Sequence, residues 1–153
     1  MVSPATGHVD TEWFDEFWEE CLILECRIDF IATHLYTGTI DERMDKLRDY
    51  SQRYGKQIWL TEFAVALEED TEKIVEFVEE FLPRLEEAGF IFRYSWFYTR
   101  YYIDHDHTSN PWFWLDSNNS LMEQEHPELS LVGQAYDKPW HLASFRESAG
   151  IST

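Results

Sequence analysis

The stretch that decides the fold is Gln57-Ile58-Trp59-Leu60-Thr61-Glu62-Phe63-Ala64. It is an apolar run, rich in β-forming residues, that ends in a carboxylate, and it predicts a buried strand over residues 57–63. Side chains along a strand alternate between its two faces. On that basis we expect Ile58, Leu60 and Glu62 to share one face of a sheet.

Glu62 stands at the end of this predicted strand. A charge at the end of a buried strand is costly unless the side chain has partners or a chemical task. At the carboxyl end of a barrel strand, that task is usually catalysis. The alternative is a surface glutamate that is solvated or paired with a cation, and spacing alone leaves both interpretations open.

Strand-like and helix-like segments alternate along the chain. Predicted strands cover residues 1–5, 28–36, 57–63 and 90–98, and predicted helices cover residues 10–22, 39–54, 71–88 and 129–136. The strands are almost continuously apolar, which is typical of a parallel sheet covered by helices. The sequence therefore predicts an α/β fold of about four βα units. Such units fit half of a (β/α)8 barrel and equally fit a small open sheet.

Local signals mark the ends of the predicted helices. Thr39 and Glu42 form a capping-box pattern at the start of the second helix, and Gly55 is a typical C-terminal stop. Pro83 lies inside the third helical pattern, where we expect it to kink the helix or to mark a break.

Composition and charge limit the partners of this chain. It has 153 residues, with 12 basic and 30 acidic side chains, and a formal net charge of −18. Such a surface repels phosphate backbones and anionic lipids, so neither nucleic acid nor a membrane is an expected partner, whereas a neutral glucan is not repelled. No secretory signal is visible at the start. Cys21 and Cys26 either pair in an oxidising compartment or remain two small thiols beside the first helix.

The ends of the predicted strands carry a series of motifs. They are Ser3-Pro4-Ala5, Asp29-Phe30-Ile31-Ala32-Thr33-His34-Leu35-Tyr36, Trp59-Leu60-Thr61-Glu62-Phe63-Ala64 and Arg93-Tyr94-Ser95-Trp96-Phe97, before a closing helix at 129–136. In this order and at βα spacing they resemble the second half of glycoside hydrolase family 128, the endo-β-1,3-glucanase-type catalytic domain. The resemblance implies the C-terminal part of a (β/α)8 TIM barrel, O-glycosyl hydrolase activity on β-1,3-glucan by a retaining mechanism, and no cofactor.

The resemblance also implies roles for particular residues. Glu62 matches the family's catalytic nucleophile, and His34 and Tyr36 match its His-x-Tyr motif, so both are expected to bind substrate. Trp96 matches an aromatic residue of the eighth strand. Trp96 and Tyr98 are expected to bind sugar, because flat aromatic rings bury the C–H faces of sugar rings well. The alternative is that aromatic side chains in this region only close the core.

A retaining glycosidase needs a second carboxyl group, about 5–5.5 Å from the first. The family's acid/base glutamate lies in an Asn-Glu-Pro motif before the Ser-Pro-Ala strand, and this chain contains no Asn-Glu-Pro. Asp104, Asp106 and Asp116 follow the last predicted strand and could approach the site, but no motif supports them. The tract at 104–107 is expected to be solvated, and no metal is expected.

Three functions are consistent with these sequence features. The first is a partial glycosyl hydrolase domain over residues 1–138, followed by an irregular tail over 139–153, with the acid/base half missing from the chain. The others are a non-catalytic glucan-binding remnant and a structural α/β interaction domain. An incomplete barrel leaves strand edges unpaired, so we expect an inactive isolated chain that self-associates through those edges. The resemblance suggests a secreted or cell-wall protein, and the sequence leaves the compartment open.

Overall fold

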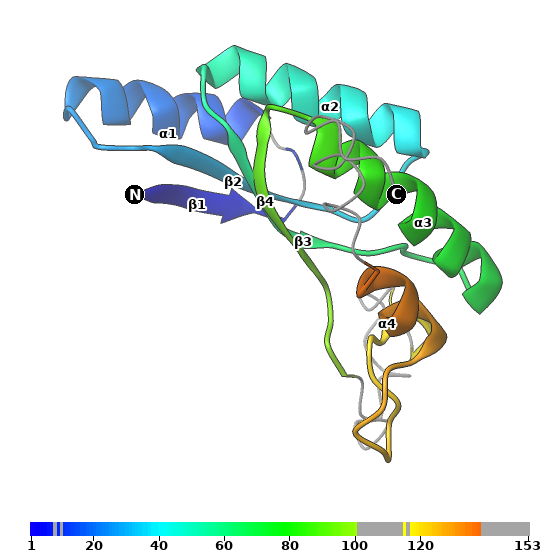
Figure 1. Ribbon diagram of the computed structural model, residues 1–153. Helices are drawn as coiled ribbons and strands as arrows, with labels where there is room; N and C mark the ends of the chain where they lie inside the picture. The colour runs from blue at the N-terminus through cyan, green and yellow to red at the C-terminus, as the bar shows by residue number, and fades with distance from the viewer. Residues whose placement is uncertain (8, 10, 101–114, 116, 139–153) are drawn as a thin grey trace, which may run out of the picture. The chain divides into compact units, whose positions relative to one another are not determined.

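The computed structural model describes residues 1–7, 9, 11–100, 115 and 117–138. Strands and helices alternate along the chain, so the α/β prediction is confirmed (Figure 1). The elements are β1 (Val2–Thr6), α1 (Thr11–Ile23), β2 (Phe30–Leu35), α2 (Ile40–Tyr54), β3 (Ile58–Phe63), α3 (Thr71–Glu87), β4 (Ile91–Trp96), the 3-10 helix η2 (Ser117–Asn119) and α4 (Leu131–Tyr136). Predicted and observed boundaries differ by one or two residues, as is usual where element ends fray.

The chain divides into two compact units, which are described separately. The first consists of Met1–Phe63 with Gly89–Ser95, and the second consists of the described residues of Ala64–Ala88 and Trp96–Thr153. The predicted boundary between a domain at 1–138 and a tail at 139–153 stays a prediction, because the tail lies outside the described residues.

The first unit is built on a four-stranded sheet in the order β1-β2-β3-β4. β1 pairs with β2, and β2 pairs with β3, both in parallel. Helices α1 and α2 lie side by side along one face of the sheet (Figure 1). Ile31, Ile58 and Leu60 are fully buried in this unit. Removing such side chains from water is worth about 1.5–3 kcal/mol each, which makes them the main source of the unit's stability.

Aromatic side chains and one ion pair join α1 to α2. The ring of Phe14, which is fully buried, lies 5.2 Å from the ring of Tyr50 and 4.7 Å from that of Tyr54. At the edge of this cluster, Arg53 forms an ion pair with Asp15, and the Tyr54 hydroxyl donates to the same carboxylate at 2.9 Å. Phe14 therefore lies on the inner face of α1, against α2.

The ends of α2 follow the signals in the sequence. The Glu42 N–H donates to the Thr39 hydroxyl at 3.3 Å, and the Thr39 N–H donates to the Glu42 carboxylate at 2.8 Å, so the capping box is confirmed. Gly55 ends the helix with φ 63° and ψ 31°, and its N–H donates to the Ser51 carbonyl. Glycine adopts this left-handed conformation without steric cost.

The end of α1 brings the two cysteines together. The Cys26 N–H donates to the Cys21 carbonyl at 2.8 Å, and Glu25, with φ 54°, donates to the Leu22 carbonyl at 3.4 Å. This pattern is a Schellman motif, which typically places the side chains at the Cys21 and Cys26 positions in contact. Both thiols are free, and the hydrogen bond with Cys26, followed by burial, raises the pKa of Cys21 to about 11.

In the second unit, α3 runs without interruption through Pro83. The predicted alternative of a break at this proline is therefore wrong. A proline inside a helix costs about 3 kcal/mol. Phe81, Leu82 and Leu85, which flank it, are buried, and each burial contributes about 1.5–3 kcal/mol, so packing outweighs the lost hydrogen bond.

Helix α4 packs against α3 in the second unit and begins at a serine cap. The Gly133 N–H donates to the Ser130 hydroxyl at 3.0 Å. A Cβ atom on Gly133 would lie 1.9 Å from the Leu121 carbonyl oxygen, so only glycine fits this close approach.

Among the described helices, none combines the length and apolar character that crossing a membrane requires.

Gly133→Ala should destabilise the second unit by about 1–3 kcal/mol, because the new methyl group overlaps backbone that cannot swing away. Alanine is the better helix former by about 1 kcal/mol, so the clash must exceed that gain. Urea unfolding followed by circular dichroism measures the difference. Gly89→Ala is the matched control, since a Cβ there meets nothing within 4 Å. Equal stability of the two variants would contradict the close approach.

Asp15→Asn should lower the Tm at neutral pH, because the hydrogen bond from Arg53 holds the pKa of Asp15 below its usual range. A carboxyl group whose pKa is lower in the folded state stabilises the fold above its unfolded pKa, about 3.9, and this contribution is lost as the pH falls through the folded value. The Tm difference should therefore be constant above about pH 5 and shrink below about pH 4. Asp45→Asn, which removes an exposed pair with Arg48, is the control. A difference that grows on acidification would overturn this assignment.

Candidate active site

The pairing of β2 with β3 contains one irregularity, and it lies beside Glu62. The two strands advance in step up to Thr33 and Leu60, but the next residue of β2, His34, pairs with Glu62. Thr61 is therefore an extra residue in β3, which is the pattern of a β-bulge. Bulges re-aim side chains and are common next to active sites.

The bulge changes the face on which Glu62 lies. His34 and Ile31 are three residues apart in β2, so they point to opposite faces of the sheet. Glu62 shares the face of its partner His34 and so lies opposite to Ile58 and Leu60. The prediction that Ile58, Leu60 and Glu62 share one face is therefore wrong, because the extra residue reverses the alternation. Both aliphatic side chains are fully buried, whereas the Glu62 side chain is 33% exposed.

Glu62 meets His34 and Tyr36 at the carboxyl ends of β2 and β3. The Tyr36 hydroxyl donates a hydrogen bond to Glu62 Oε2, and His34 Nδ1 lies 3.3 Å from the same oxygen. The rings of His34 and Tyr36 meet edge to face, with their centroids 6.3 Å apart. The structure thus brings together three of the residues predicted for the site, from two neighbouring strand ends.

The phenol of Tyr36 is a fixed hydrogen-bond donor. Burial, followed by the neighbouring Glu62 carboxylate, raises the pKa of Tyr36 far above its ordinary value. The hydroxyl therefore stays protonated at neutral pH and donates to the carboxylate. Hydrogen bonds to an ionised acceptor are about twice as strong as neutral ones, so this contact holds Glu62 in one orientation.

Trp96 and Tyr98 belong to the second unit and are described there. Trp96 is only 5% exposed, and its Nε1–H donates to the Asn119 carbonyl at 2.7 Å. The backbone carbonyl of Tyr98 accepts from the Leu121 N–H at 3.4 Å. Burial of Trp96 favours the core interpretation of this side chain, and sugar binding by Trp96 and Tyr98 stays a prediction.

Several predicted residues lie outside the described part of the chain. Asp104, Asp106 and Asp116 are among them, as is the whole tract at 104–107. Within the described residues, no group of three or more histidine, cysteine, aspartate or glutamate side chains is placed to hold a metal ion.

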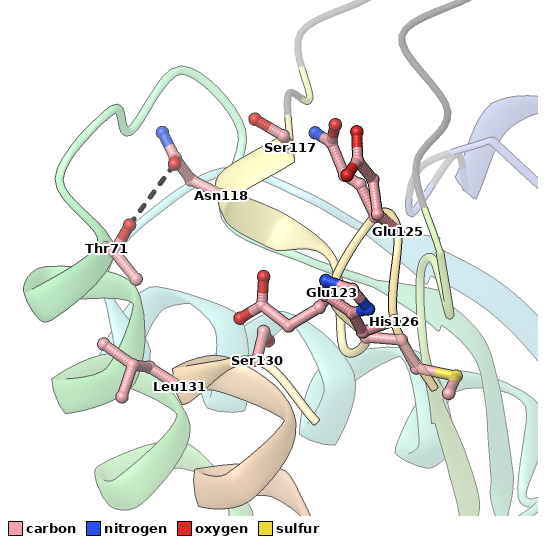
Figure 2. A pocket seen from close by; sticks show the side chains of 10 residues that line it. Thr71, Ser117, Asn118, Glu123, Glu125, His126, Ser130 and Leu131 are labelled. Carbon is pink, nitrogen blue, oxygen red and sulfur yellow. Dashed lines mark hydrogen bonds between the residues drawn. The ribbon is translucent and has the colours of Figure 1, made fainter. Parts of the chain in front are cut away.

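A cavity of about 510 Å³ lies in the second unit, where the loop before α4 faces the start of α3 (Figure 2). Its wall is polar, with Glu123, Glu125 and His126 on one side. Thr71 donates to the Asn118 side chain across the wall at 3.3 Å. None of the residues predicted to contact substrate lines this cavity.

Arg43 contacts the main chain beside the candidate site, and the sequence analysis did not predict this residue. It lies near the start of α2, is 2% exposed and donates to the carbonyl oxygens of Leu35, Tyr36 and Gly38. A signal was present, because Arg43 precedes the buried Leu47 by four residues and so occupies a position in the apolar stripe of the helix.

Parallel strands that alternate with helices and carry polar side chains at their carboxyl ends are the arrangement of α/β-barrel proteins. Within this class, the chain belongs to the glycosyl hydrolase catalytic core family, whose profile matches residues 1–136. The resemblance to glycoside hydrolase family 128 is therefore confirmed.

Solved structures and a curated protein extend this comparison. An exo-β-1,3-glucanase from Cryptococcus neoformans, of subgroup V of glycoside hydrolase family 128, is 28% identical, with a TM-score of 0.72. The match covers 92% of this chain and 54% of that chain. An endo-β-1,3-glucanase from Amycolatopsis mediterranei, of subgroup I of the same family and in complex with laminaritriose, is 23% identical, with a TM-score of 0.67. That match covers 88% of this chain and 56% of that chain. Alkali-sensitive linkage protein 1 of Schizosaccharomyces pombe is 35% identical over 102 residues, 63% of this chain and 19% of that protein.

This chain therefore spans about half the length of the glucanases that it matches and about a fifth of the yeast protein. The likeness to these barrel enzymes confirms that the four βα units correspond to part of a (β/α)8 barrel.

Trp96→Phe should lower the free energy of unfolding by about 1–3 kcal/mol, because it removes the donor to a buried carbonyl group while keeping a ring in place. Urea unfolding measures the loss. Trp13→Phe is the matched control, since the Trp13 side chain is 46% exposed on α1. Unchanged stability of Trp96→Phe would favour a sugar-binding role over a core role.

Proposed function

We propose that this chain supplies the nucleophile of an active site that hydrolyses β-1,3-glucan with retention of anomeric configuration. The observation that carries the proposal is Glu62, which is held at the end of β3 by Tyr36 and His34. Membership of the glycosyl hydrolase catalytic core family supports the reaction class. The β-1,3-glucanases of similar fold, one of them with laminaritriose bound, support the substrate class.

The contacts of Glu62 suit a nucleophile. In a retaining glycosidase, one ionised carboxylate attacks the anomeric carbon, the glycosidic bond breaks, and water later releases the glycosyl group. Both described contacts of Glu62, from Tyr36 and from His34, end on Oε2, which leaves Oε1 to face the sugar. Tyr36 keeps the carboxylate from rotating, so its attack geometry is set before substrate arrives. His34 lies beside it, and we propose that its ring binds a sugar hydroxyl.

The acid/base carboxyl group must come from elsewhere. The described hydrogen-bond and ion-pair partners of Glu62 are Tyr36 and His34, and neither is a carboxylate. The matched glucanases are longer than this chain, and the Asn-Glu-Pro motif that the resemblance assigns to the acid/base does not occur in it. We therefore propose that the acid/base is contributed by further βα units of a completed barrel.

The sheet of the first unit is open to such completion. Its order places β1 at one edge and β4 at the other, and each edge strand has one neighbour in the described sheet. Unpaired edges attract other strands. We propose that these edges receive the missing βα units in a completed barrel and that they drive self-association when the chain is alone.

The test is reducing-sugar release from laminarin by residues 1–153 alone and by the same residues joined to the N-terminal βα units of a family 128 glucanase. General acid–base assistance is worth about 10²–10⁴-fold, so the chain alone should show no measurable turnover. The completed barrel should be active, and Glu62→Gln should reduce that activity by several orders of magnitude, because an amide cannot attack as a carboxylate does.

Glu76→Gln, an exposed change on α3, is the matched control and should leave turnover unchanged. Full activity of Glu62→Gln in the completed barrel would contradict the assignment of the nucleophile. Robust turnover by the 153-residue chain alone would contradict the placement of the acid/base outside it. Laminarin-oligosaccharide binding without turnover in every form would instead support a non-catalytic glucan-binding protein.

A further inference from the structure

Arg43 is a buried arginine whose hydrogen bonds converge on the segment that carries Tyr36. Its Nε donates to the Gly38 carbonyl at 2.9 Å, one terminal nitrogen donates to the Tyr36 carbonyl at 2.9 Å, and the other donates to the Leu35 carbonyl at 3.4 Å. Gly38 follows Tyr36 by two residues and has φ 99°, a left-handed conformation that glycine adopts readily. The guanidinium therefore grips the end of β2 and the turn that follows it.

This placement is costly. Burial lowers the pKa of Arg43 to about 10, so the side chain is still charged at neutral pH but has lost most of its contact with water. The residue also lies in the first turns of α2, where the helix dipole disfavours a positive charge. A leucine would complete the apolar stripe of α2 at no such cost. The buried arginine thus requires a benefit that packing alone does not supply.

The main-chain segment that Arg43 contacts carries Tyr36, the hydrogen-bond donor to Glu62. The Tyr36 side chain leaves the segment between two carbonyls that Arg43 holds, and its hydroxyl donates to Glu62 Oε2. The residue before it, Leu35, pairs with Phe63, directly after the pairing of His34 with Glu62. A shift of the turn would therefore move the donor away from the carboxylate, and a displacement of about 1 Å is enough to cost a catalytic contact.

We propose that Arg43 is the positioning residue of this site, which fixes the main chain around Tyr36 so that its hydroxyl holds Glu62 in the orientation for attack. The role rests on the proposed function of Glu62 as nucleophile. Arg43 acts only through Tyr36. The planar fork of arginine reaches three carbonyl groups at once, which the single ammonium group of lysine does not.

The first readout needs no activity. In the purified 153-residue chain, the hydroxyl proton of Tyr36 should give a downfield, slowly exchanging proton resonance, because it is hydrogen-bonded to a carboxylate, and Tyr36→Phe assigns it by its loss. Arg43→Met should abolish this resonance or shift it upfield. Arg48→Met, on the exposed side of the same helix, should leave it unchanged.

The second readout is kinetic and uses the completed barrel. Arg43→Met should lower kcat by about 10- to 100-fold, since the attacking group is misplaced, and should change KM by less than about threefold. Arg43→Lys keeps the charge and one donor group, so it should fold even if Arg43→Met does not, and it should recover part of both the kcat and the Tyr36 resonance.

The two proposals fail separately. A wild-type barrel without turnover would remove the proposed function, while the Tyr36 resonance would still report whether Arg43 holds that side chain. Turnover that depends on Glu62, together with an unchanged resonance and an unchanged kcat in Arg43→Met or Arg43→Lys, would overturn the positioning role and leave the proposed function standing. A uniform loss of Tm without a change in either readout would make Arg43 a structural residue only.

Discussion

The pairing of His34 with Glu62 across β2 and β3 is the constraint on which the candidate site depends. If the register continued unbroken past Thr33 and Leu60, His34 would pair with Thr61, and Glu62 would share the buried face of Leu60. An ionised carboxylate on that face would lose its hydration and cost several kcal/mol. The bulge instead moves the charge to the partly exposed face, where a histidine and a tyrosine meet it. The register shift between β2 and β3 therefore decides whether the Glu62 carboxylate is buried without partners or partly exposed beside His34 and Tyr36.

The buried charge of Arg43 is a second energetically costly feature next to the same site. Three carbonyl groups, those of Leu35 at the end of β2 and of Tyr36 and Gly38 after it, accept from one side chain of α2, and an unsatisfied carbonyl at the buried Leu35 would be expensive. Arg43 satisfies them, at the price of burying its charge. The bulge lies directly before Glu62 in β3, and the buried arginine contacts the main chain of Tyr36, whose hydroxyl donates to Glu62. Local rules of sequence and structure are typically broken where function demands it, and here two are broken together.

In the second unit, a polar side chain organises a segment with little regular structure. The Asn119 side chain accepts from the Val65 N–H and donates to the Val65 carbonyl, each at 3.1 Å. The backbone carbonyl of Asn119 accepts from the Trp96 side chain. Asn119 is 1% exposed, so these bonds are made away from water, where leaving them unmade is costly. This 3-10 helix, η2, lies between the predicted strand at 90–98 and the predicted helix at 129–136. Long-range partners such as these cannot be found from local periodicity, because Val65 and Asn119 are 54 residues apart in the sequence.

The sequence by itself determined the order and type of the elements, the capping of α2 and the residue types at the strand ends. These follow from local physics: apolar periodicity, the conformational freedom of glycine and the hydrogen-bonding reach of short polar side chains. The sequence also placed His34, Tyr36 and Glu62 together through their motifs. Tertiary structure alone decided the face on which Glu62 lies, the continuity of α3 through Pro83 and the burial of Arg43. Each of these depends on contacts between segments that are distant in the chain, and there the energy of packing and pairing exceeds the local preference.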